Sequence, residues 1–142
     1  MKLGVLSDVH GNLDGFEACL EDMGAVDLLL FGGDLLGYYF DGPTILRRLR
    51  SLGAQCLAGN HDLYFLSHLG RAQPSDLHVP SRAEYRQRYG PSLELAETAL
   101  TAEEIDFLSG LPTSRELTLD GRTLLHVHGS PWRPADEYVY PD

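Results

Sequence analysis

The sequence contains no apolar run that approaches the roughly 18 residues of a membrane-spanning helix, so we expect no membrane-embedded segment. Cysteines are also scarce: Cys19 and Cys56 are the only two, and they form no C-x-x-C pair. This scarcity excludes a disulfide framework and a cysteine-rich zinc site, and we interpret both residues as buried thiols of a reducing compartment. Met1 and Lys2 lead directly into a short predicted strand, which does not fit a secretory leader. A cytoplasmic location is therefore expected.

Basic residues are few. Lys and Arg total 11 against 21 Asp and Glu, which gives a net charge of −10 at pH 7. The electrostatic field of a negatively charged protein repels polyanions, so sequence-specific binding of nucleic acid is not expected. A small anionic substrate held by metal ions is compatible with this net charge. With 43% hydrophobic and 23% charged residues, the composition is that of an ordinary globular protein. Without repeats or low-complexity tracts, we predict a single domain over residues 1–142.

Apolar patterning predicts alternating strands and helices in the first part of the chain. Short apolar runs are typical of buried strands, and apolar residues spaced three and four apart are typical of helices. The predicted strands are 2–7, 27–31 and 55–58, and the predicted helices are 13–23 and 43–52. Such strand–helix units favour parallel pairing with right-handed crossovers. The fold class is therefore α/β.

The second part of the chain is predicted to be a helical insert followed by a β-hairpin. The insert spans about 63–110, with a loop around 73–80 and helices at 81–89 and 101–108. Asp120-Gly121 is a dipeptide that favours a tight turn. We therefore expect residues 115–119 and 122–127 to pair as antiparallel strands across it.

Polar side chains follow each of the predicted strands. They are Asp8, His10, Asp34, Asn60, His61, Asp62 and His128. Ligands of open α/β sheets bind at the carboxyl ends of the strands, so these side chains are expected to lie close together. Carboxylate, imidazole and amide groups together suit manganese, iron or zinc better than calcium. Any one of these residues alone could serve a turn, but their recurrence indicates a metal site.

Four ordered motifs carry a family resemblance. They are Asp8-x-His10, Gly33-Asp34, Gly59-Asn60-His61-Asp62 and His128-Gly129. In this order they resemble the first four motifs of the calcineurin-like metallophosphoesterase superfamily, and within it the bacterial predicted phosphodiesterases related to diadenosine tetraphosphatases. The resemblance implies a four-layer α-β-β-α sandwich, with the second sheet incomplete in this chain.

The resemblance also implies two divalent metal ions. Asp8 and His10 would bind one ion, Asp34 would bridge the two, and Asn60 and His128 would bind the other. Two ions held in this way can clamp a phosphoryl group and lower the pKa of a bridging water. The implied activity is hydrolysis of a small phosphodiester, phosphomonoester or dinucleoside polyphosphate by a metal-bridging hydroxide.

His61 and Asp62 would have a different role by the same resemblance. His61 would not bind metal but would stabilise charge on the phosphoryl group and protonate the departing oxygen. Asp62 would hold the imidazole of His61 in its orientation and make it more basic.

One motif of the family is not found before Asp142: the Gly-His-x-His that contributes one histidine to each metal. The chain is therefore either naturally shortened, with weakened activity, or part of a longer one. His126 and His128 share a strand face and could themselves be that pair, but Leu125 stands in place of the motif's glycine. This favours His128-Gly129 as the fourth motif, with His126 as a core histidine or a support for a ligand.

An interaction module is the alternative to an enzyme. A metallophosphoesterase fold without its closing histidines could use exposed hairpin edges for partner binding, including a second copy of itself as a homo-oligomer. Bound metal per chain and hydrolysis with manganese distinguish the two.

Overall fold

The structure is a computed structural model that describes residues 1–141. The elements in chain order are β1 (Leu3–Leu6), α1 (Leu13–Met23), β2 (Leu28–Phe31), α2 (Gly42–Ser51), β3 (Gln55–Cys56), α3 (Asn60–His68), α4 (Arg82–Tyr89), α5 (Ser92–Ala99), α6 (Ala102–Ser109), β4 (Ser114–Leu119) and β5 (Arg122–Val127). The α/β class predicted from the sequence is confirmed. Across these residues, no helix is long and apolar enough to cross a membrane.

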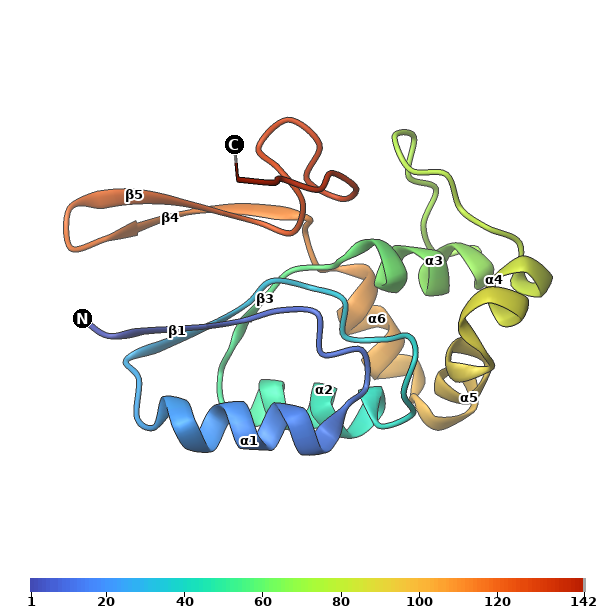
Figure 1. Ribbon diagram of the computed structural model, residues 1–142, viewed down its shortest axis with the longest axis horizontal. Coiled ribbons are helices and arrows are strands. Elements are labelled where there is room, and N and C mark those ends of the chain that lie inside the picture. Colours follow the sequence, from blue (N-terminus) through green and yellow to red (C-terminus); the bar gives the residue numbers. More distant parts are fainter. Residues whose placement is uncertain (142) are drawn as a thin grey trace.

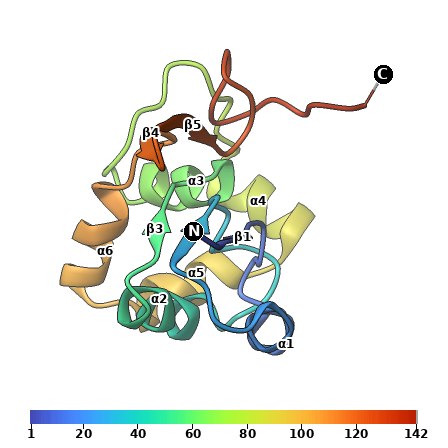
Figure 2. The ribbon, with the colours of Figure 1, turned by 90° about the vertical axis from the view of Figure 1, so that its left-hand side faces the viewer.

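The first three strands form a parallel sheet with β2 in the centre. Helices α1 and α2 lie together on one face of this sheet, and the β4–β5 hairpin lies on the other (Figures 1 and 2). The run Leu28–Phe31 becomes buried along most of its length, as expected for a strand covered on both sides. The sheet therefore directs the loops after all three strands toward the same edge.

The β4–β5 hairpin is the beginning of the second sheet. Its antiparallel register pairs Leu119 with Arg122, and both turn residues, Asp120 and Gly121, have positive φ angles of 49° and 74°, which is the geometry favoured for a tight hairpin turn. Arg115 in β4 donates a hydrogen bond to the side chain of Gln55 in β3, at 2.7 Å. The second sheet has only two strands in residues 1–141, as predicted from the resemblance.

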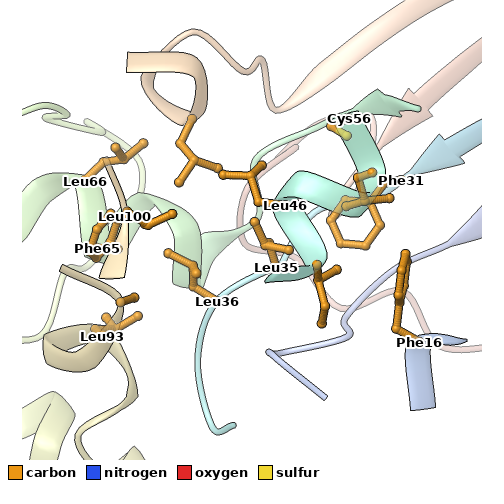
Figure 3. Packing of buried hydrophobic residues seen from close by; sticks show 14 of the residues in the cluster. Phe16, Phe31, Leu35, Leu36, Leu46, Cys56, Phe65, Leu66, Leu93 and Leu100 are labelled. Carbon is orange, nitrogen blue, oxygen red and sulfur yellow. The ribbon is translucent and has the colours of Figure 1, made fainter. Parts of the chain in front are cut away.

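The hydrophobic core lies between the parallel sheet and its helices and continues into the insert. Ile45, Leu46 and Leu49 of α2 are fully buried. Figure 3 shows Phe16 and Phe31 packed at one end of the core, with residues of α3 and α5 at the other. This packing fixes the strand ends relative to the insert, so the loops between them have a rigid base.

The helical insert differs from the prediction at two points. Helix α3 begins at Asn60, whereas the helical insert was predicted to begin at about residue 63. The backbone N–H of Gly59 donates to the carboxylate of Asp62 at 3.0 Å, which caps the helix start and draws these residues into its first turn. Helix α5, over Ser92–Ala99, was not predicted; its eight residues are too few to show a clear period.

Two burial predictions were wrong. Val5 in β1 is 62% exposed, although that strand was expected to be buried. Gly4 faces Met23 of α1, so the alternation of the strand turns Val5 to the opposite side of this edge strand. Cys19 is exposed, because the buried side of α1 is centred on Phe16, whereas Cys56 is buried as expected. Burial also raises the pKa of the Cys56 thiol to about 12, so this thiol stays protonated.

A partly buried ion pair links α2 to the N-terminus of α6. Arg47 donates two hydrogen bonds to Glu104, at 2.6 and 3.1 Å, and the backbone N–H of Thr101 donates a third, at 2.9 Å. The Glu104 side chain is almost completely buried. Hydrogen bonding to Arg47, with further help from Thr101, lowers the pKa of Glu104 from 4.5 to about 2.

We expect Glu104→Gln to destabilise the protein by about 1 kcal/mol at pH 7. Because the pKa is lowered on folding, this contribution is complete above the unfolded pKa of 4.5 and is lost as the pH falls toward 2. Urea unfolding at pH 7 and pH 3 measures it, and the difference between variant and wild type should shrink at pH 3. Glu103→Gln, in an exposed pair with Arg50, is the control and should change stability little. Equal losses in both variants would contradict the prediction.

Candidate metal centre

The candidate metal centre lies where the strands of the parallel sheet end. Asp8 follows β1 by two residues and Asp34 follows β2 by three. Asp8, His10 and Asp34 all have positive φ angles, of 56°, 47° and 56°. This backbone conformation is unfavourable for residues other than glycine. Non-glycine residues that adopt it are concentrated at functional sites. Hydrogen bonds from Asp8 N to Gly33 O and from His10 N to Asp34 O hold the two loops in it, each at 3.0 Å.

Asp34 occupies the middle of the centre, and its two carboxylate oxygens face different histidines. Oδ2 lies 3.5 Å from Nε2 of His10, and Oδ1 lies 3.8 Å from Nε2 of His128. Nε2 of His128 is also 3.0 Å from Oδ1 of Asn60. The carboxylate of Asp34 therefore connects one group of potential ligands to the other.

The spacing of these atoms fits divalent ions. Ligand atoms of Asp8, Asp34 and His128 lie within 4.8 Å of one another. Two ligand atoms bound at about 2.1 Å to the same ion are separated by roughly 3.0 to 4.2 Å. The contacts of Asp34 with His10 and His128, and that of Asn60 with His128, lie in this range. The five predicted ligands thus have a donor set and spacing that can hold metal.

The electrostatics of Asp34 also favour a cation. Burial, followed by the charges of Asp62 and Asp8, raises the pKa of the Asp34 carboxyl group from 3.8 to about 9. The backbone N–H of His61 donates to Oδ1 at 2.8 Å and opposes this shift in part. A buried carboxylate next to two others gains strongly from a nearby positive charge.

Two of the histidines are fixed in a way that suits metal ligands. Nδ1 of His10 is 3.0 Å from the carbonyl oxygen of Leu36, and Nδ1 of His128 is 2.8 Å from that of Gly32. A carbonyl oxygen only accepts hydrogen bonds, so each Nδ1 carries the proton and each Nε2 presents a lone pair. Both lone pairs lie next to carboxylate oxygen of Asp34, and a cation between them relieves the repulsion.

His61 lies in the first turn of α3 with its ring buried between aromatic side chains. Burial, followed by the charges of His10 and His128, lowers its pKa from 6.5 to about 4, so the free imidazole is neutral at pH 7. Its Nδ1 is 2.7 Å from the hydroxyl group of Tyr85 in α4. Tyr85 was not identified from the sequence, because no local pattern relates a residue of the insert to the site.

The predicted contact between Asp62 and the ring of His61 was wrong. The carboxylate of Asp62 accepts hydrogen bonds from the backbone N–H groups of Gly59, Leu35 and Leu36, at 3.0, 3.2 and 2.9 Å. Adjacent residues in the first turn of a helix point in different directions, so Asp62 faces the loop after β2. Its burial raises its pKa, and the three N–H groups oppose that shift. Asp62 therefore fixes the loop that carries Asp34.

Gly59 leaves the space that Asp34 occupies. A Cβ atom at Gly59 would lie 2.1 Å from Oδ1 and 2.4 Å from the backbone nitrogen of Asp34. The backbone of Gly59 has φ −92° and ψ −179°, an ordinary extended conformation. The requirement for glycine at this position is therefore set by close contact with the candidate bridging ligand, and not by backbone strain.

We expect Gly59→Ala to lower manganese affinity by about 10- to 100-fold, because the methyl group displaces the Asp34 carboxylate. Isothermal titration calorimetry measures the affinity, and thermal unfolding reports any change in stability. Gly110→Ala is the matched control, since a Cβ there meets nothing closer than 3.5 Å. If both variants bound manganese like the wild type, the placement of Asp34 against Gly59 would be wrong.

A cavity of about 320 Å³ opens over these residues. Asp8, His10, Asp34, Asn60, His61 and His128 all line it, and Tyr38 forms part of its wall. Its other side is formed by residues 135–139 of the C-terminal segment, including Asp136 and Glu137. This segment was not assigned to the site from the sequence, because it has no periodic pattern. The cavity is large enough for a small phosphoester next to the candidate ligands.

Comparison with known proteins identifies the family. The family model described as calcineurin-like phosphoesterase matches residues 1–142, the whole chain. The chain belongs to the calcineurin-like phosphoesterase family. Phosphoester hydrolysis is the activity that this family name describes, and the resemblance found in the four motifs is confirmed.

Individual relatives agree with that membership. A crystal structure of a metallophosphoesterase from Sphaerobacter thermophilus superposes with a TM-score of 0.71 and 31% identity, over 99% of this chain and 51% of that one. An uncharacterized protein of Methanocaldococcus jannaschii is 26% identical over 99% of this chain and 54% of its own length. The symmetrical bis(5'-nucleosyl)-tetraphosphatase of Sodalis glossinidius is 34% identical over 56% of this chain and 31% of its own. The chain thus spans about half of the first two relatives and less of the third.

Proposed function

We propose that the protein is a dinuclear metal-dependent phosphoesterase. The observation that carries the proposal is the position of Asp34, whose two oxygens lie next to different imidazoles, those of His10 and His128. A carboxylate placed in this way is suited to bridge two ions. Asp8 and His10 would hold the first ion, and Asn60 and His128 the second.

The metal ions and the residues of the site have different roles in the proposed reaction. When bound, two divalent ions supply an activated water as nucleophile and offset the charge of the phosphoryl group. Manganese, iron and zinc fit the mixed oxygen and nitrogen donors. Asp34 orders both sets of ligands, and the hydrogen bonds of His10 and His128 to backbone carbonyls hold their Nε2 atoms toward it.

His61 acts on the leaving group. Its ring lines the cavity beside the ligands, and Nδ1 is occupied by Tyr85. The other ring nitrogen is then available to the substrate. An incoming phosphoryl group brings negative charge, which raises the pKa of His61 from its low value and favours the doubly protonated ring. That imidazolium can then donate a proton to the departing oxygen.

We propose a small phosphodiester, phosphomonoester or dinucleoside polyphosphate as the substrate. The tetraphosphatase of Sodalis glossinidius supports the last of these, since its name describes a dinucleoside polyphosphate as its substrate. The cavity of about 320 Å³ has room for a phosphoryl group together with part of its substituent.

A substrate panel tests the proposal. The protein is stripped with EDTA, reloaded with manganese, and assayed with bis(4-nitrophenyl) phosphate, 4-nitrophenyl phosphate and diadenosine tetraphosphate. We expect turnover of at least one ester that requires metal and returns on reloading, with about two ions bound per chain. Metal uptake without turnover of any of the three would reject the enzymatic proposal.

The exposed aromatic residues favour a second candidate, an interaction module. Trp132, Tyr138 and Tyr140 are all more than 70% exposed on the C-terminal segment, and such a concentration of apolar surface is typical of partner contacts. This candidate predicts neither metal uptake nor hydrolysis. The same two measurements therefore decide between the two candidates.

A further inference from the structure

Three histidines of the site are held through the same ring nitrogen, but by different kinds of partner. Nδ1 of His10 and Nδ1 of His128 each contact a backbone carbonyl oxygen, whereas Nδ1 of His61 contacts the hydroxyl group of Tyr85 at 2.7 Å. A carbonyl accepts only, while a hydroxyl both donates and accepts. The two carbonyl partners require a proton on Nδ1, and the hydroxyl partner does not.

The partner of His61 keeps its own proton. Tyr85 is 2% exposed and His61 is 5% exposed, so their contact is shielded from water. Burial raises the pKa of the Tyr85 phenol above its usual value of 10, so the hydroxyl proton is present at neutral pH. It is available for donation to Nδ1, which then needs no proton of its own.

Neighbouring groups leave the two side chains little freedom. A Cβ atom at Gly37 would lie 2.8 Å from Nδ1 of His61 and 2.9 Å from the hydroxyl of Tyr85. The ring of Tyr89 packs 5.0 Å from that of His61 and 4.8 Å from that of Tyr85, and Tyr38 stacks on His61 at 5.3 Å. The loop after β2 and helix α4 thus enclose this one hydrogen bond.

We propose that Tyr85 is a positioning residue that donates its hydroxyl proton to Nδ1 of His61 and so keeps the imidazole proton on Nε2, facing the metal pocket. His61 then carries its proton on Nε2, whereas His10 and His128 carry theirs on Nδ1. With this opposite assignment, neutral His61 donates a hydrogen bond into the pocket, whereas His10 and His128 present lone pairs that suit metal ligands. The inference deepens the proposed function and rests on it for the role of His61 in hydrolysis.

Nitrogen-15 NMR of the histidine rings tests the assignment without turnover. Zinc-loaded protein is used, because manganese broadens the signals, and the His61 ring is assigned from the signal lost in His61→Gln. At pH 8 we expect an unprotonated Nδ1 and a proton on Nε2 in the wild type. In Tyr85→Phe we expect a mixture of tautomers and a changed Nδ1 shift. A proton on Nδ1 of wild-type His61 would overturn the proposal, and this result does not depend on how the variant folds.

Kinetics supply the second measurement. For a dialkyl phosphate, or any other ester whose leaving group is an alkoxide, Tyr85→Phe should lower kcat about tenfold with little change in KM. A 4-nitrophenolate leaving group needs no proton and should leave at nearly the wild-type rate. Tyr89→Phe is the control, because its ring also packs on His61, and it should stay within about twofold.

The outcomes separate the two proposals. Equal effects of Tyr85→Phe and Tyr89→Phe, with no change in the His61 ring signals, would reduce Tyr85 to a packing residue. If the wild type hydrolyses none of the esters, the proposed function fails, but the NMR experiment still decides whether Tyr85 sets the protonation of His61.

Discussion

Asp34→Asn is expected to abolish metal-dependent hydrolysis, with a loss of at least about 1,000-fold in kcat. Asparagine keeps the size of the side chain but has one oxygen in place of two equivalent ones, so it cannot bridge two ions. The loss of charge also removes the main attraction for cations at a buried site, where Asp34 has its pKa raised to about 9 by burial and by its acidic neighbours. Metal content by mass spectrometry of the purified protein, together with the rate, measures both effects.

The metal-free form of this variant should fold at least as well as the wild type. Because its pKa is raised from 3.8 to about 9, the Asp34 carboxyl group must take up a proton when the metal-free protein folds at pH 7, and asparagine avoids that cost. Thermal unfolding in EDTA tests this. Glu21→Gln, an exposed acidic position on α1, is the control and should keep metal and activity. Two ions per chain in Asp34→Asn would refute the bridging role.

His61→Ala is expected to lower kcat by about 100-fold or more for esters with an alkoxide leaving group. The variant removes the group that the site places next to the ligands and leaves the predicted ligands themselves in place. Metal content should therefore remain near the wild-type value, which separates this variant from Asp34→Asn. With 4-nitrophenolate as the leaving group the loss should be smaller, because that anion departs without a proton.

The control for this variant is a second histidine outside the centre. His78→Ala changes an exposed residue of the α3–α4 loop and should leave the rate within about twofold. Circular dichroism confirms that both variants fold. Full activity of His61→Ala toward an alkyl ester would show that proton donation by this ring does not contribute to the reaction.

The strand ends could be predicted because they depend on local pattern. The apolar run Leu28–Phe31 and the glycines after it indicated a central strand with Asp34 at its end, and the structure has both. Parallel pairing then places the loops after β1, β2 and β3 at one edge of the sheet. Asp8, Asp34 and Asn60 could therefore be assigned to one site from sequence alone.

The first turn of α3 was harder to predict because two tendencies compete there. Gly59-Asn60 is typical of a loop, whereas the carboxylate of Asp62 satisfies the N–H of Gly59 and starts a helix. Whether these residues form a loop or a helix decides where the side chains of His61 and Asp62 point. In a loop Asp62 could have reached the ring of His61, but in the helix it faces the loop after β2.

The contact between Tyr85 and His61 could not be predicted from local sequence pattern. Tyr85 lies 24 residues after His61, in a helix whose sequence is mostly polar. Its contact with His61 depends on how α4 packs against α3, and this packing is set by the whole core. The exposure of Cys19 has the same origin, since the width of the buried face of α1 is determined by the neighbouring α2.

The contact between Asn60 and His128 joins positions 68 residues apart, which has a consequence for the order of events during translation. At about 5–20 residues per second, His128 is made roughly 3 to 14 seconds after Asn60. The nascent chain meanwhile carries Asp8, Asp34 and Asn60 without His128. On the proposed function, loading of the second ion would wait until the β4–β5 hairpin has emerged and docked, so metallation would be late and coupled to formation of the second sheet.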